Sequence, residues 1–86
     1  DVRKFIKETS FEFYDWVNDA SNVLPLNTRL YKGTLFNDFC EEYPDFKKFL
    51  SQKRFNSFLK SYSELNKLKF KDGKDTIGRY VEFSLE

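Results

Sequence analysis

The sequence predicts an α+β fold in which three helices precede a C-terminal β-hairpin. Before residue 65, apolar side chains recur three or four positions apart over three separate stretches, which is the spacing of one helix face. Beyond it they alternate with polar side chains, which is the period of a β-strand. The 86 residues suit one domain, and a composition that is 40% hydrophobic and 20% aromatic is too apolar for a disordered chain.

The first helix is predicted over residues 10–20. Its apolar residues stand at i, i+3, i+4 and i+7: Phe13, Trp16, Val17 and Ala20. Thr9 followed by Glu12 has the form of a capping box, which marks a helix start. Phe5 and Ile6 extend the apolar stripe upstream, either as a continuation of this helix or as a separate turn that ends near Thr9.

The second helix is predicted over residues 34–43, after a linker over 21–27 and a short extended piece over 28–31. Its apolar residues are Leu35, Phe36, Phe39, Cys40 and Tyr43. Thr34 is the expected N-cap. Pro44 is the expected stop, because the residue before a proline is disfavoured in the helical conformation.

The third helix is predicted over residues 52–63. It follows a connection over 45–50 that carries two apolar anchors, Phe46 and Phe49. Ser51 is a suitable N-cap for it. Its apolar face is formed by Phe55, Phe58, Leu59 and Tyr62.

The rest of the chain is predicted to form a β-hairpin. In the first strand, Leu68 and Phe70 alternate with lysines, and Asp72-Gly73 is the expected turn. The apolar residues of the second strand are Val81, Phe83 and Leu85.

The order of these elements matches a winged helix-turn-helix with three helices and a two- or three-stranded hairpin as the wing. In this arrangement residues 1–27 hold the N-terminal helix and linker, 28–65 the helix-turn-helix and 66–86 the wing, all within a single domain over 1–86. The hairpin requires the helices, because an isolated two-stranded sheet is marginally stable. The chain has no methionine, even at position 1, so we expect it to be a piece of a longer protein.

Charge divides the chain into two halves. Residues 1–45 carry five Lys or Arg against nine Asp or Glu, whereas residues 46–86 carry ten against five. Such asymmetry favours a polyanionic partner for the basic half, and an ordinary solvated lysine-rich surface explains it equally well.

The third helix is the first candidate binding element. If its apolar residues face the core, its solvent side carries cations and hydrogen-bond donors: Lys53, Arg54, Asn56, Ser57 and Lys60. Such side chains can read base edges in the major groove of DNA. A solvent-facing helix surface has a similar composition, so this alternative stays open.

The wing is the second candidate. Its cations are Lys69, Lys71, Lys74 and Arg79, of which Lys69 and Lys71 point to the same side of their strand. A basic wing suits phosphate contacts. The alternative is that lysines on a small exposed sheet prevent edge-to-edge pairing with other chains.

Composition excludes most enzyme chemistries. The chain has no histidine and one cysteine, Cys40, so the usual zinc ligand sets, a histidine general base and an internal disulfide are absent. Glu41, Glu42 and Asp45 are expected to form a solvated helix end, and Cys40 a buried thiol. We expect no catalysis, metal or cofactor. Apolar runs are too short for a membrane span or a secretory signal, so we expect a soluble cytoplasmic domain without membrane contact.

Residues 33–62 and 72–83 carry three short motifs of a known group of proteins. A helix of the form L-[YF]-x-x-[FY] is present as Leu35, Phe36 and Phe39. A helix opening S/T-x-x-x-F and carrying F-x-x-[WFL]-L is present as Ser51, Phe55, Phe58 and Leu59. A terminal G-R-[YFW] strand is present as Gly78, Arg79 and Tyr80. With these motifs, residues 28–86 resemble the C-terminal winged-helix domain of phage, plasmid and mobile-element primase-helicases related to the poxvirus uncoating NTPase.

The resemblance implies DNA binding in replication, with the domain positioning its parent enzyme on an origin or fork. The Walker motifs of the helicase part and the acidic residues of the primase part have no counterpart here, which fits an accessory domain without catalysis.

Our functional hypothesis is therefore a non-catalytic winged-helix module of a replication protein that binds duplex or forked DNA. The alternative is a protein-interaction winged helix that docks on the parent helicase or primase domains, or on a replication partner, through the acidic half and exposed aromatics such as Phe11 or Tyr14. A third alternative is a domain that only caps the parent fold.

Overall fold

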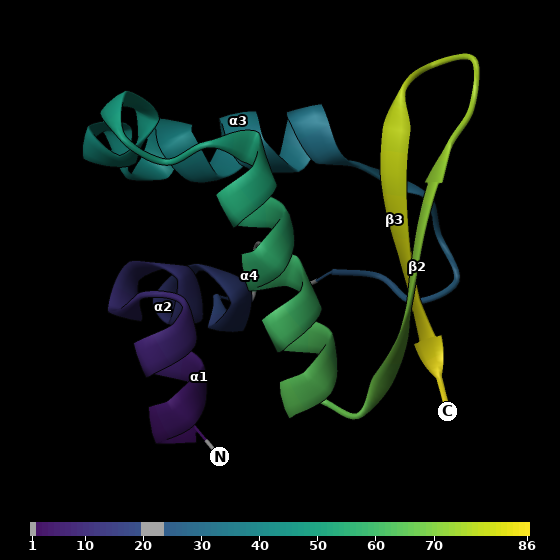
Figure 1. Ribbon diagram of the computed structural model, residues 1–86, viewed down its shortest axis with the longest axis horizontal. Helices are drawn as coiled ribbons and strands as arrows, with labels where there is room; N and C mark the ends of the chain where they lie inside the picture. The colour runs from purple at the N-terminus through teal and green to yellow at the C-terminus, as the bar shows by residue number, and fades with distance from the viewer. Residues whose placement is uncertain (1, 20–23) are drawn as a thin grey trace.

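The computed structural model describes residues 2–19 and 24–86 and has an α+β architecture (Figure 1). Its elements are α1 (Val2–Glu8), α2 (Phe11–Asn18), β1 (Leu30–Tyr31), α3 (Lys32–Glu42), the 3-10 helix η2 (Pro44–Lys48), α4 (Gln52–Leu65), β2 (Leu68–Lys74) and β3 (Arg79–Leu85). The predicted α+β class is confirmed. In Figure 1, α4 runs through the middle of the molecule, with α1 and α2 on one side and the hairpin on the other, and α3 lies across the top of α4.

The three strands form one antiparallel sheet in the order β1-β3-β2. The short strand β1 corresponds to the last two residues of the extended piece predicted over 28–31, and it pairs Leu30 with Val81 and Tyr31 with Tyr80. Pairing of β2 with β3 leaves one face of the hairpin against the helices and the other outside.

The hairpin turn lies three residues later than the sequence predicted. Asp72 and Gly73 are inside β2, and the last pair before the turn joins Lys74 to Arg79. Gly73 belongs in the strand because the Tyr80 ring packs over it. A Cβ atom at this position would lie 2.6 Å from the Tyr80 hydroxyl oxygen.

The turn itself, residues 75–78, is organised by an aspartate and a glycine. The Asp75 carboxylate accepts hydrogen bonds from the backbone N–H groups of Ile77 (2.8 Å) and Gly78 (3.1 Å). Gly78 has a φ of +157°, a conformation that favours glycine. These local bonds close the loop without the Asp72-Gly73 pair.

At the N-terminus, α1 and α2 are two separate helices, which settles the alternative left open by the sequence. The Thr9 hydroxyl donates to the Phe5 carbonyl oxygen at the end of α1 (2.7 Å). The N-cap of α2 is Ser10, whose hydroxyl accepts from the Phe13 backbone N–H (3.0 Å). The capping box predicted at Thr9 is therefore wrong by one residue. The end of the predicted helix, at residue 20, and the linker residues 21–23 lie outside the described residues.

The boundaries of α3 and α4 follow the predicted ones closely. α3 begins at Lys32, two residues before the expected start, and its N-cap is Tyr31 without a side-chain cap bond, so the predicted Thr34 cap is wrong. It ends at Glu42, ahead of Pro44 as predicted. α4 has the predicted Ser51 N-cap, whose hydroxyl accepts from the Arg54 backbone N–H (3.1 Å).

The core is an aromatic cluster between the helices and the inner face of the sheet. Phe13 lies at its centre, fully buried, with ring centroids of Phe39 and Phe58 at 5.8 and 5.2 Å. From β3, Val81 and Phe83 close the cluster on the sheet side. Cys40 is buried in the same cluster, as expected.

Candidate nucleic-acid interface

The solvent side of α4 is a shallow basic groove of about 560 Å³. Its lining residues are Ser51, Lys53, Arg54, Asn56, Ser57 and Lys60. The 100° step of the helix buries Phe55, Phe58 and Leu59 on the opposite side, so all predicted α4 site residues share the outer face. Lys53, Arg54 and Lys60 are exposed, and the Arg54 guanidinium lies over the Phe58 ring, 5.9 Å from its centroid.

Two polar residues in this groove have restricted hydrogen bonding. The Asn56 side-chain oxygen is buried and has no hydrogen-bond partner among the described residues. It cannot accept a bond from a base in this conformation, so the paired recognition of adenine by Asn56 requires a side-chain rotation. The Ser57 hydroxyl already donates to the Arg54 carbonyl oxygen (2.6 Å). In this conformation the charged side chains of the groove are Lys53, Arg54 and Lys60.

The hairpin divides its four predicted site residues between two faces. Lys69 and Lys71 share the outer face, as predicted, where their cross-strand neighbours are Ser84 and Glu82. They also lie on the edge strand β2. Lys74 and Arg79 are cross-strand neighbours at the loop end of the hairpin. Because side chains alternate along a strand, both lie on the same face as Phe70, which packs toward the helices.

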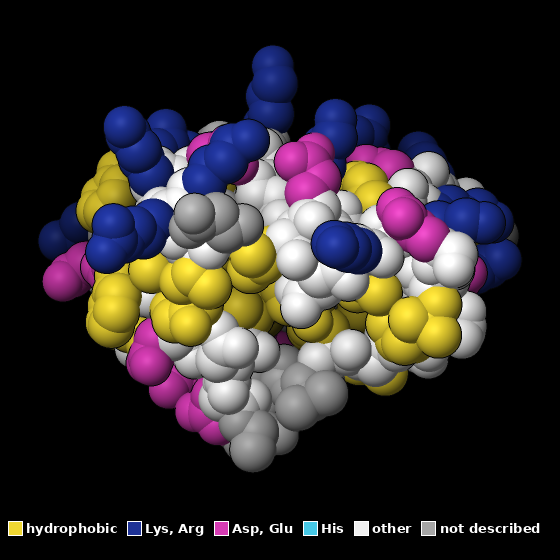
Figure 2. All heavy atoms as spheres, turned by 90° about the horizontal axis from the view of Figure 1, so that it is seen from below, with side chains coloured by type: hydrophobic (Ala, Val, Ile, Leu, Met, Phe, Trp, Pro, Cys, Tyr) yellow, Lys and Arg dark blue, Asp and Glu magenta, His cyan; other side chains and the backbone are white. Residues whose placement is uncertain are grey.

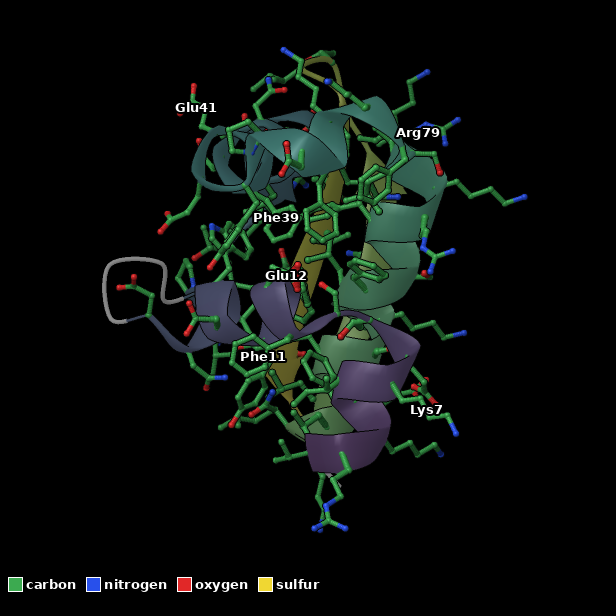
Figure 3. The ribbon with its side chains drawn as sticks, turned by 90° about the vertical axis from the view of Figure 1, so that its left-hand side faces the viewer. Lys7, Phe11, Glu12, Phe39, Glu41 and Arg79 are labelled. Carbon is green, nitrogen blue, oxygen red and sulfur yellow. The ribbon has the colours of Figure 1, made fainter. Side chains whose placement is uncertain are left out.

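The loop end of the hairpin adjoins the start of α4. A pocket of about 470 Å³ lies between them, lined by Arg79 and Ile77 from the hairpin, Gln52 from α4 and residues of β1 and the α3 N-terminus. In Figure 3, Arg79 lies on the side of the molecule where α4 runs. The structure therefore brings Lys74, Arg79 and the α4 cations to neighbouring surfaces, and it places Lys69 and Lys71 across the sheet from the helices.

Two carboxylates of the hairpin are paired with cations from the first half of the chain. Lys32 contacts Asp72 at 2.7 Å, and Arg29 contacts Asp75 at 2.9 Å. Among residues 2–19 and 24–86, the proposed DNA-binding cations of α4 and the hairpin take part in no ion pair. Asp72 and Asp75 are thus compensated by cations from outside the hairpin, whereas Glu82 lies opposite Lys71.

Asp75 is the charged centre of this arrangement. It accepts hydrogen bonds from the Tyr31 hydroxyl (2.8 Å), the backbone of the turn and the Arg29 guanidinium. The Tyr31 bond is the largest of the causes that hold the Asp75 pKa at about 2, below its ordinary value of 3.8. Arg29 also lies over the Tyr80 ring, 4.6 Å from its centroid, so the loop is tied to β1 from both sides.

We expect acid to weaken the fold through Asp75. Because its folded pKa lies below its unfolded pKa, its contribution to stability is complete above about pH 4 and disappears as pH falls toward about 2. In thermal unfolding at pH 5, the Asp75→Asn chain should have a lower Tm than the natural sequence. Between pH 5 and pH 2, its Tm should fall by less than that of the natural sequence. Asp38→Asn, at an exposed position of α3, is the control and should retain the natural pH dependence. An unchanged profile for Asp75→Asn contradicts the assignment.

Sequence reasoning missed the contribution of α1 to the basic surface. This helix packs against α4, and the Ser61 hydroxyl of α4 donates to the Glu8 carboxylate (3.4 Å). In Figure 3, Lys7 lies on the same side as Arg79, whereas Glu41 lies on the opposite side. Figure 2 shows Lys and Arg side chains gathered along its upper edge, which is the side facing the viewer in Figure 1. The signal in the sequence was Lys7, inside a half that is acidic overall, whereas Lys4 of the same helix is paired with Glu8 at 3.9 Å.

The described residues contain no helix long and apolar enough to span a membrane. Within the same residues, no cluster of three or more Cys, Asp or Glu has the arrangement of a metal site. No protein-family model, curated protein or solved structure matches the chain.

Proposed function

We propose that this chain is a non-catalytic winged-helix module that binds DNA through α4 and the loop end of its hairpin. In this assignment α3 and α4 form the helix-turn-helix, α4 is the recognition helix, and the hairpin is the wing. The observation that supports it most directly is the shared pocket of Gln52 and Arg79, because it makes the two basic elements neighbours in space.

The binding mode follows from the placement of the cations. The major groove of B-form DNA is wide enough to admit a helix, and α4 presents Lys53 and Arg54 in its first turn, where a recognition helix meets base edges and phosphates. Lys74 and Arg79 would then contact backbone phosphates beside α4. Phosphate contacts position the protein and dominate its affinity.

Lys69 and Lys71 remain part of the proposal as outer contacts. Because they lie on the other face of the sheet, a duplex on α4 reaches them only around the β2 edge. Forked DNA, with a second arm, has more opportunity to do so. In a primase-helicase, the parent implied by the sequence resemblance, such a module would position the enzyme on duplex or forked DNA.

The salt dependence of binding tests this function. With about five phosphates neutralised, log K should fall against log[salt] with a slope of roughly −4 to −5. Fluorescence anisotropy with a labelled duplex and with a labelled fork of the same length, between low and physiological salt, measures the slope and the preference. Absence of binding to either DNA at low ionic strength, or a slope near zero, would overturn the proposal.

Residue-resolved titration locates the interface in the same experiment series. DNA binding through the proposed surface shifts the amide resonances of residues 52–60 and 74–79. The protein-interaction alternative predicts instead that DNA leaves these resonances unchanged and that a partner protein shifts the resonances of the first predicted helix, α2.

A further inference from the structure

A second groove lies at the end of the molecule opposite the hairpin, at the corner formed by α2, the end of α3 and η2. It has a volume of about 510 Å³. Its apolar lining residues are Tyr43, Pro44, Phe46 and Phe49. Its other lining residues are all carboxylates: Glu12, Glu42 and Asp45. In Figure 1 this corner lies at the upper left, and the hairpin lies at the right.

The floor of the groove is an aromatic row that leads from the core to solvent. The ring of Phe46 lies 5.2 Å from that of the fully buried Phe39, and the ring of Phe49 lies 5.1 Å from that of Phe46. Phe49 is 69% exposed, among the most exposed large apolar side chains of the described residues. Because the Phe46 ring packs on the core, the exposed Phe49 ring packs on a side chain that is itself held in place. An exposed aromatic side chain in a fixed position is typical of a binding surface.

The charged residues that line the groove are all negative, and the exposed Lys47 and Lys48 of η2 lie outside this lining. Tyr43 donates its hydroxyl to the Asp15 carboxylate (3.0 Å). Burial first, and then that bond together with the charges of Asp15, Glu42 and Glu12, raises the Tyr43 pKa to about 12. Neither Asp15 nor any of the three lining carboxylates is in an ion pair within the described parts of the chain. Figure 3 shows Glu12 between α2 and the α3 layer, on the face that the groove occupies.

We propose that this groove docks a short segment of a partner protein in which one or two large apolar side chains are flanked by Lys or Arg. The apolar residues would cover Phe49 and Phe46, and the flanking cations would meet Glu42, Asp45 and Glu12. Charge complementarity fixes this choice of occupant, because an anionic segment or a nucleic acid would be repelled by these carboxylates. The groove lies on different elements from the basic surface, so the proposal does not depend on DNA binding.

The test uses a synthetic amphipathic peptide of about 12 residues containing Lys, Leu and Phe, titrated into the isotopically labelled 86-residue chain to about 2 mM. The expected result is a saturable shift of amide resonances from residues 42–49 and of Glu12. The same peptide with Glu in place of Lys should bind at least about tenfold more weakly. Shifts confined to other residues, no shift at the highest concentration, or equal binding of the two peptides would overturn the proposal.

Matched substitutions separate the groove from general surface effects. Phe49→Ala should weaken binding of the Lys peptide by at least about fivefold. Phe11→Ala removes an equally large side chain that is 63% exposed and lies outside the groove, so it should leave the affinity unchanged. Equal affinity of the Phe49→Ala chain and the natural chain would contradict the proposal. DNA affinity measured on the same Phe49→Ala chain should stay unchanged, which keeps the outcome of this test distinct from that of the DNA experiment.

Discussion

Phe13→Ala is expected to lower the free energy of unfolding by about 3–5 kcal/mol. Phe13 has no exposed surface, and its ring meets those of Phe39, Phe55 and Phe58 at centroid distances between 5.2 and 5.8 Å. Removing the ring leaves a cavity at the junction of α2, α3 and α4, which the surrounding rings cannot fill without losing their own contacts. Since small domains are stabilised by about 5–15 kcal/mol in total, this loss is a large part of the whole.

Urea unfolding followed by tryptophan fluorescence measures the effect, because Trp16 lies 5.9 Å from the Phe13 ring. Phe11→Ala is the matched control two residues away, and we expect it to change stability by less than about 0.5 kcal/mol. A Phe13→Ala chain that loses less than about 1 kcal/mol would contradict the central role of this ring.

Lys53→Glu combined with Arg54→Glu is expected to lower DNA affinity by at least about 100-fold at low salt. Each change removes a charge-assisted contact worth about 1.5–3 kcal/mol and adds a repulsive charge, and each 1.4 kcal/mol corresponds to about tenfold in affinity. The magnitude of the salt slope should also fall by about 2, one for each lost phosphate contact. Anisotropy titrations at several salt concentrations give both quantities.

The control is Lys47→Glu combined with Lys48→Glu, which alters the net charge by the same amount. Both lysines are exposed on η2 and outside the α4 groove. We expect this pair to weaken binding by less than about threefold, through the long-range field alone. Equal losses in the two double variants would show that binding follows net charge and not the α4 surface.

Much of the local structure could be predicted from sequence because its causes lie within a few residues. Ser51 caps α4 because its hydroxyl accepts a hydrogen bond from a backbone N–H three residues later. Pro44 ends α3 because its ring disfavours the helical conformation of the residue before it. The apolar spacing of α4 likewise identified the face that is buried and, by exclusion, the face that carries Lys53 and Arg54. These features depend on backbone geometry, which the chain sets without reference to distant parts.

The candidate site was predicted less completely, since it depends on contacts between distant segments. Alternation showed that Lys69 and Lys71 share a face, but the position of the turn decides on which face Lys74 lies. The sequence did not show that α1 lies beside the α4 cations, because that position depends on the packing of α1 on α4. The groove of Glu12 and Phe49 joins residues from α2 and the end of η2, whose proximity no local pattern encodes.

The sequence by itself determined the three main helices, the Ser51 cap of α4 and the presence of a hairpin, because these arise from hydrogen bonds and side-chain periods spanning a few residues. Only the tertiary structure decided where the hairpin turns, and the reason is steric and electrostatic. The Tyr80 ring occupies the space beside Gly73, and Asp75 is held by Arg29 and Tyr31, more than 40 positions earlier in the chain. Packing of rings and pairing of charges over such separations follow from the folded arrangement as a whole, which also places the α4 cations and the carboxylates of the second groove on different elements.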